Sequence, residues 1–183
     1  MSEFKPPVPG AAVAIETPTK KEGEVSPEQL AEMKERVVSM LRVIRTGMEP
    51  MDANSSLRKL NVEQSAEVRL SPEVQEAAIQ AIIQSLHGAR VETIKLIIKY
   101  FRISEETLRS SEIAPAAQEG ALAMLREGNL SGMKSIAAQF HIPADFFQTR
   151  EAKEAARVGV EKLSTYVTVR EDLIAAIKSG FGL

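Results

Sequence analysis

The sequence predicts an all-α protein, an α-α superhelix in which about four helical hairpins form a short solenoid. Three observations carry this prediction. Apolar residues recur at helical spacing along most of the chain. Pro and Gly fall between these runs, where turns are expected. A stretch of about 40 residues is repeated along the chain. Aromatic residues make up only 4% of the sequence and Trp is absent, so aliphatic side chains must fill the core.

Residues 1–25 are predicted to form a disordered tail, because four prolines interrupt any periodicity and remove backbone donors. Order is expected to begin at Ser26–Gln29, which has the spacing of a capping box with a first-turn proline. Apolar residues then follow at helical spacing. Gly47 and Pro50 are expected to end this first helix.

The clearest repeat aligns residues 74–108 with residues 113–147 at an offset of 39, without a gap. A match over this length indicates two copies of one structural unit. The paired residues are Ala78/Ala117, Ile83/Leu122, Leu86/Leu125, Val91/Leu130, Ile94/Met133, Lys95/Lys134, Ile97/Ile136, Phe101/Phe140 and Ile103/Ile142.

A short marker is expected to close each unit. Phe101-Arg102-Ile103, Phe140-His141-Ile142 and Phe181-Gly182-Leu183 follow one another at steps of 39 and 41, and a further step of 41 backwards gives Leu60-Asn61-Val62. The marker therefore predicts four units in one domain over residues 26–183. Their approximate bounds are 26–62, 63–103, 104–142 and 143–183. A lone hairpin of this size cannot bury its apolar stripe, so the units are expected to stack into a right-handed superhelix.

Each unit is predicted to consist of a helix, a tight turn, a second helix and a short capped segment. In the third unit the first helix is expected over residues 113–126, and Gly128-Asn129 supply the turn. Recurring alanine pairs such as Ala116-Ala117 allow neighbouring helices to approach closely. A capping box at Thr168–Glu171 is expected to open the last helix, and Ser71-Pro72 and Ile142-Pro143 to restart the helical path between units.

The run Pro72–Ala78, with Gly120, Leu125, Gly128-Asn129 and Phe140–Pro143, resembles the degenerate helical-hairpin repeats of large, mostly uncharacterised bacterial proteins. These repeats are similar in size to tetratricopeptide, ankyrin and HEAT units. The chain departs from those consensus sequences, since the tetratricopeptide aromatic pair and the ankyrin Thr-Pro-Leu-His are absent. The resemblance covers residues 71–183 well and 30–62 weakly. It implies an α-solenoid whose commonest use is protein binding.

The charges of the chain nearly cancel, with 23 basic and 25 acidic residues spread evenly along it. We therefore do not expect charge-driven binding to nucleic acid or to an anionic membrane. No apolar stretch approaches the roughly 18 residues that a membrane span needs, and no signal peptide is recognised, so we expect a cytoplasmic protein. The absence of Cys excludes disulfides and thiolate metal sites.

The sequence predicts no catalytic, cofactor-binding or metal-binding residues and hence no enzyme. Gly128–Ser135 approaches the phosphate-loop pattern, but its second Gly is one residue early and a helix is expected before it. The two histidines, His87 and His141, lie too far apart in sequence to share one helical turn. Carboxylate pairs such as Glu105-Glu106 lie at expected helix starts, where the helix dipole stabilises negative charge.

Lys95, Lys99 and Lys134 are the candidate partner-binding residues, because they lie on second helices and Lys95 and Lys134 hold equivalent repeat positions. The simple repetition of a polar face is the alternative explanation. The densest basic set, which acidic neighbours nearly neutralise, is interpreted as a solvated face: Arg36, Arg42, Arg45, Arg58 and Lys59.

The leading functional hypothesis is a protein-interaction or scaffold module that offers a mixed-charge groove to a protein or peptide. The alternatives are an RNA-binding helical-repeat protein and a structural segment of a longer or self-associating solenoid. The sequence leaves the oligomeric state and the identity of the partner open.

Overall fold

The computed structural model describes residues 26–46, 50–63, 66–166 and 170–183. Within these ranges the chain forms ten α-helices, one 3-10 helix and no strand, which confirms the all-α prediction. The tail predicted for residues 1–25 lies outside the described residues. The helices are α1 (Pro27–Arg45), α2 (Pro50–Glu63), α3 (Ala66–Arg69), α4 (Pro72–His87), α5 (Val91–Phe101), α6 (Glu105–Leu108), α7 (Ala114–Arg126), α8 (Leu130–Gln139), α9 (Arg150–Ser164) and α10 (Glu171–Phe181), with the 3-10 helix η1 (Ala144–Gln148) before α9.

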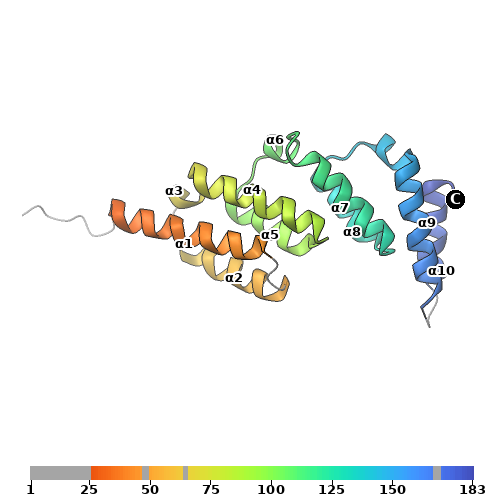
Figure 1. The fold of residues 1–183 in the computed structure, drawn as a ribbon, viewed down its shortest axis with the longest axis horizontal. Coiled ribbons are helices and arrows are strands. Elements are labelled where there is room, and N and C mark those ends of the chain that lie inside the picture. Colours follow the sequence, from red (N-terminus) through yellow and green to blue (C-terminus); the bar gives the residue numbers. More distant parts are fainter. Residues whose placement is uncertain (1–25, 47–49, 64–65, 167–169) are drawn as a thin grey trace, which may run out of the picture.

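The helices form two layers that run along a row (Figure 1). In the first layer α1 packs on α4, α4 on α7, and α7 on α9. In the second layer α2 packs on α5, whereas α5 touches α8 at only a few residues. Extensive contacts join α4 to α5, α7 to α8, and α9 to α10 across the layers. The helix axes turn along the row, from roughly parallel to it at α1 to across it at α9 (Figure 1).

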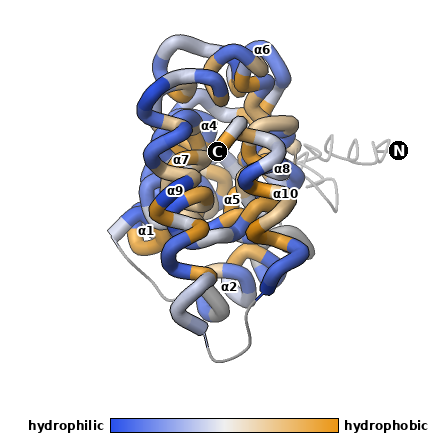
Figure 2. The backbone as a smooth tube through the Cα atoms, turned by 90° about the vertical axis from the view of Figure 1, so that its right-hand side faces the viewer, coloured by the Kyte–Doolittle hydropathy of each residue, from blue (hydrophilic) through white to orange (hydrophobic). Residues whose placement is uncertain are grey.

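The core lies between the two layers, and hydrophilic residues occupy the outer turns of the helices (Figure 2). Among the described residues, the buried polar side chains are those of Ser71, Ser85 and Thr93. One alanine of each predicted pair is fully buried in the first layer, namely Ala78, Ala117 and Ala156. These side chains are small enough to let helices pack closely.

Two glycines allow a still closer approach between helices of the first layer. A Cβ atom at Gly120 of α7 would lie 2.9 Å from the Leu86 carbonyl oxygen of α4. A Cβ atom at Gly159 of α9 would lie 2.0 Å from the Leu125 carbonyl oxygen of α7. The approach of Gly159 to Leu125 repeats, 39 residues later, the approach of Gly120 to Leu86. The first layer is therefore held together by backbone-to-backbone approach as well as by side chains.

The predicted helix starts are present at Ser26, at Ser71 and near residue 113, whereas α10 begins at Glu171 with Arg170 rather than Thr168 as its N-cap. The Gln29 backbone N–H donates to the Ser26 hydroxyl oxygen at 3.2 Å, and Ser26 N–H donates to the Gln29 side chain at 3.0 Å, which confirms the capping box. The helix expected over residues 113–126 is α7. After Pro143 the chain forms η1 before α9 begins at Arg150. The predicted box at Thr168–Glu171 lies partly outside the described residues.

The Phe-x-Ile marker corresponds to a left-handed helix end at three places. Arg102, His141 and Gly182 have φ angles of 50°, 52° and 63°. In each case the N–H of the next residue donates to a carbonyl five residues back, at 3.2, 3.0 and 3.0 Å. This geometry is that of the Schellman motif, in which the left-handed residue stops the helix and satisfies free carbonyls. The preceding phenylalanine is buried each time.

The fourth marker, predicted at Leu60-Asn61-Val62, is not a helix end. These residues lie within α2, which continues to Glu63. The unit boundary predicted at about residue 62 nevertheless falls within one residue of the end of α2, and residues 64–65 after it lie outside the described residues. A step of 39 from α5 gives residues 52–62, which lie within α2 (Pro50–Glu63).

Candidate functional site

A groove in the second layer is the candidate functional site. Because α4 and α7 approach through Gly120 while α5 and α8 touch at few residues, the second layer opens between α5 and α8. The groove has a volume of about 490 Å³ and extends to α2. This volume lies within the range of about 300–1,000 Å³ that is typical of ligand sites.

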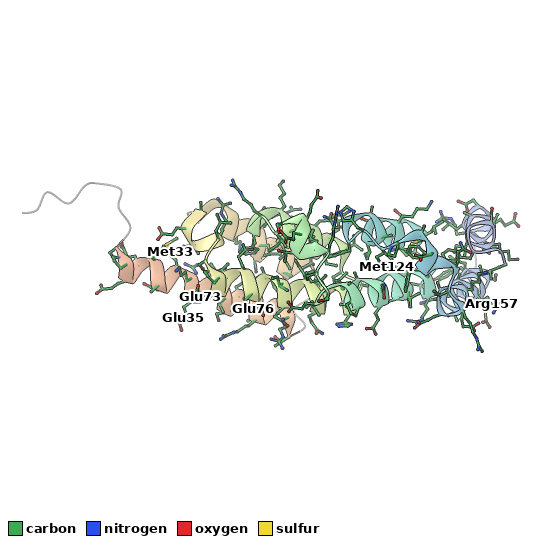
Figure 3. The ribbon with its side chains drawn as sticks, turned by 90° about the horizontal axis from the view of Figure 1, so that it is seen from above. Met33, Glu35, Glu73, Glu76, Met124 and Arg157 are labelled. Carbon is green, nitrogen blue, oxygen red and sulfur yellow. The ribbon has the colours of Figure 1, made fainter. Side chains whose placement is uncertain are left out.

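The apolar part of the groove combines the side chain of Met124, which is only 5% exposed, with the partly exposed turn before α5. Met124 belongs to α7 and lies between α7 and α8 (Figure 3). It fits there because residue 132 is Gly, whose Cβ atom, if present, would lie 2.5 Å from the Met124 sulfur. Ala89 and Val91 add further apolar surface. The groove can therefore accommodate a small apolar group beside its polar walls.

Two asparagines on opposite sides of the groove are held by hydrogen bonds within the protein. The Asn129 Oδ1 atom accepts a hydrogen bond from the Gly132 backbone N–H at 2.8 Å and so caps α8. The Asn54 Oδ1 atom accepts from the hydroxyl of Thr93, a side chain that is 1% exposed, at 3.1 Å. Residues 54, 93 and 132 all line the groove and are spaced by 39.

The charged side chains of the groove come from the start of α5. The Lys95 ammonium group forms an ion pair with Glu92 at 2.9 Å. The Arg90 guanidinium group lies 3.5 Å from the Ile44 carbonyl oxygen. With two cations and one anion, the groove has a formal charge of +1. Two hydroxyls of α8, those of Ser131 and Ser135, complete the polar wall.

The structure separates the three lysines that the sequence suggested. Lys95 lines the groove. Lys99 and Lys134 are exposed on α5 and α8 and do not line it, although Lys134 is the repeat equivalent of Lys95. A partner-binding role for all three therefore stays a prediction, and only Lys95 shares a site with other polar groups.

Sequence reasoning missed the two asparagines and Thr93. The sequence predicts Asn129 only as a turn residue and assigns no binding role to Asn54. The available signal was the offset of 39, which connects residue 54 to 93 and 93 to 132. The phosphate-loop-like segment Gly128–Ser135 also contributes to the groove wall, but it follows the helix α7, and Met133 is buried as part of the core.

The two histidines lie in separate contacts, His87 between the second and third units and His141 within the third. His87 Nδ1 is 3.0 Å from a carboxylate oxygen of Glu119 on α7. His141 Nε2 is 3.1 Å from the guanidinium of Arg109. In the part of the chain that the structure describes, no group of three or more His, Asp or Glu side chains could hold a metal ion.

Part of the predicted basic set borders a second hollow, between α1 and α4. Arg42 and Arg45 line this space of about 440 Å³ together with Glu73 and Glu76. The backbone N–H of Glu73 lowers the pKa of its own carboxyl group, which keeps this side chain negative. The hollow therefore has mixed charge, as expected for a solvated face.

Comparisons of the chain with protein-family models, with curated proteins and with solved structures found no match. Among the described helices, none combines the length and the apolar character that crossing a membrane requires.

Proposed function

We propose that this chain is a non-enzymatic protein-interaction module, an α-α superhelix of four hairpins that binds a peptide segment of a partner protein. The groove between α5 and α8 is the observation that carries the proposal. It is open to solvent, mixes apolar and polar surface, and contains polar side chains whose orientation is fixed by hydrogen bonds. Such preorganised polar groups beside apolar surface give orientation and specificity to a bound segment.

The repeated local geometry supports the hairpin part of the proposal. Gly120 and Gly159 make the same backbone approach one step apart, and left-handed residues end α5, α8 and α10 in the same way. Units of this kind form an extended surface when they stack, because each unit contacts its neighbours only. A groove between successive second helices is then the natural place for a partner segment.

Photocrosslinking from the groove tests the proposal. A photoreactive residue replaces Ser135 in the groove wall, and a matched variant carries the same residue at the exposed Ser179 of α10. In extract of the source cells, we expect a saturable protein adduct from position 135 that excess unmodified chain removes. Position 179 should give no such adduct. Identical products from both positions, or no saturable product from position 135, would contradict the proposal.

A further inference from the structure

The groove offers hydrogen-bond donors in excess of acceptors. A backbone N–H can only donate, so the bond from Gly132 N–H fixes which end of the Asn129 carboxamide is the oxygen. The Asn54 oxygen is likewise engaged by the Thr93 hydroxyl. Each asparagine therefore has its acceptor occupied within the protein and its Nδ2 amino group left for a ligand.

The charged groups of the groove also favour a ligand that accepts hydrogen bonds. The Glu92 carboxylate is the one anionic side chain of the groove and is already engaged by Lys95. The ammonium group of Lys95 has further donors, and the guanidinium group of Arg90 carries only donors. A ligand that presents acceptors and negative charge is therefore complementary to the groove, whereas a cationic ligand would meet like charge.

Both peptides and nucleic acids present acceptors, and three observations favour a peptide. No aromatic side chain lines the groove, so nothing there can stack on a base. The formal charge of +1 is small for phosphate-driven binding. Val91 and Ala89, which are partly exposed, provide apolar surface that suits a small aliphatic side chain beside the largely buried Met124.

We infer that the groove between α5 and α8 binds an extended peptide segment that carries a carboxylate and a small apolar side chain. The Nδ2 groups of Asn54 and Asn129 donate to its main-chain carbonyls, and Lys95 with Arg90 attracts its carboxylate. This inference rests on the proposed function, because it names the ligand of the same groove.

The test uses two conservative variants that replace a hydrogen-bond donor by an acceptor and keep the fold. In Asn129→Asp an oxygen still accepts from Gly132 N–H, and Asp is as good a helix N-cap as Asn. In Asn54→Asp an oxygen still accepts from Thr93. Each change replaces an amino donor by a carboxylate oxygen, so binding of an acidic peptide should weaken while urea unfolding is nearly unchanged.

The probe is an array of random nine-residue peptides, presented in one set with amidated and in another with free carboxyl ends. We expect wild-type full-length chain to select peptides rich in Asp and Glu. The double variant of Asn54→Asp and Asn129→Asp should bind those peptides about tenfold more weakly, which corresponds to about 1.4 kcal/mol. Selection that needs the free carboxyl end would assign the carboxylate to a C-terminus, and equal selection in both sets would assign it to a side chain.

A pair of lysine variants provides the matched control. Lys95→Glu changes a charge inside the groove, and Lys134→Glu makes the same change at the equivalent repeat position outside it. Only the first should lose the acidic peptides. Selection without acidic residues, identical profiles for wild type and the double variant, or displacement of the peptides by a twelve-nucleotide oligo(U) would overturn the inference. If the array shows no acidic selection while position 135 still gives a saturable crosslink, the inference fails and the proposed function stands.

Discussion

α7 and α9 hold corresponding places in the first layer, but they differ in how much of their surface is covered. α7 packs against α4, α8 and α9, whereas α9 packs against α7, η1 and α10. Leu122 of α7 is 3% exposed, and the residue one step later in α9 is the exposed Glu161. Gln118 is half-buried and its counterpart Arg157 is exposed at the end of the row (Figure 3).

The comparison shows that the element packed against a repeat position determines whether the residue there is charged. Where a following hairpin covers the helix, the residues are uncharged and at least half-buried, as Leu122 and Gln118 are. Where solvent covers it, the position is charged, and stacking of another hairpin would bury Arg157 and Glu161 at a high desolvation cost. α9 therefore has the charged outer face that a capping helix of a repeat array needs.

Truncating side chains at equivalent positions of α7 and α9 should give the largest difference in unfolding free energy between the two helices. Leu122→Ala removes buried side-chain atoms and leaves a cavity between α7 and its neighbours, so we expect a loss of about 2–4 kcal/mol of unfolding free energy. Glu161→Ala should change it by less than about 0.5 kcal/mol. Urea unfolding of both variants measures the difference. Equal losses would mean that the two positions are covered alike.

Methyl groups added to glycines should give the next largest effects. Gly159→Ala places a Cβ atom 2.0 Å from a backbone oxygen, so we expect a loss of about 2–3 kcal/mol. Gly120→Ala, at 2.9 Å, should cost less, because its clash is milder and Ala favours helix by about 1 kcal/mol. Gly180→Ala is the control. It has no neighbour within 4 Å and should be neutral or stabilising in the same urea titration.

The N-caps of α8 and α9 should contribute equally to the unfolding free energy, although the two helices differ in burial. Thr149 accepts a hydrogen bond from Ala152 N–H at 3.2 Å, as Asn129 does from Gly132 N–H. Thr149→Ala and Asn129→Ala should each lower the unfolding free energy by about 1 kcal/mol. Thermal unfolding followed by circular dichroism checks both, and Thr149→Ser should retain the wild-type midpoint. A loss of stability in Asn129→Ala alone would show that the contribution of these caps depends on burial.

Apolar substitutions on the outer face of α9 should change assembly more than stability. The double variant Arg157→Leu and Glu161→Leu replaces the charges on the outer face of α9 by apolar side chains, so we expect concentration-dependent self-association. Sedimentation velocity measures it. Glu35→Leu on the exposed side of α1 at the other end is a control for added surface hydrophobicity. A double variant that sediments like wild type would contradict the view that these charges prevent stacking.

The smallest effect should come from the exposed ion pair between Glu127, just after α7, and Lys162 of α9. The hydrogen bond from Lys162 to Glu127 raises the lysine pKa above its ordinary value of 10.5. A raised folded-state pKa stabilises the protein below the unfolded-state value and loses its effect as pH rises through the folded-state value. Glu127→Gln should therefore lower the melting temperature slightly at pH 7, but not at a pH above the folded-state pKa of Lys162. An equal difference at both pH values would exclude the ion pair as its cause.

Much of the fold follows from local chemistry, and those parts could be predicted. The Phe-x-Ile marker and the offset of 39 located the ends of α5, α8 and α10 because helix stops depend on a few adjacent residues. The first unit was harder. A step of 41 placed the marker inside α2, which continues to Glu63.

The groove could not be predicted from the same patterns. Its existence depends on how far α5 and α8 diverge, which follows from the approach of α4 and α7 through Gly120. Asn129 has a sufficient local explanation as a helix cap, and Thr93 lies in an otherwise apolar stripe. Their shared role emerges only when two units are placed side by side, so Lys95 was the one groove residue that the sequence proposed for partner binding.

Amide chemical-shift mapping tests the central claim most directly. Uniformly ¹⁵N-labelled chain is titrated with the nine-residue peptide that wild type selects most strongly from the array. The account predicts that shifts concentrate in residues 89–95 and 129–135, around the groove, while residues 150–164 of α9 stay unchanged. Shifts concentrated on the outer face of α9, or in the hollow between α1 and α4, would contradict it.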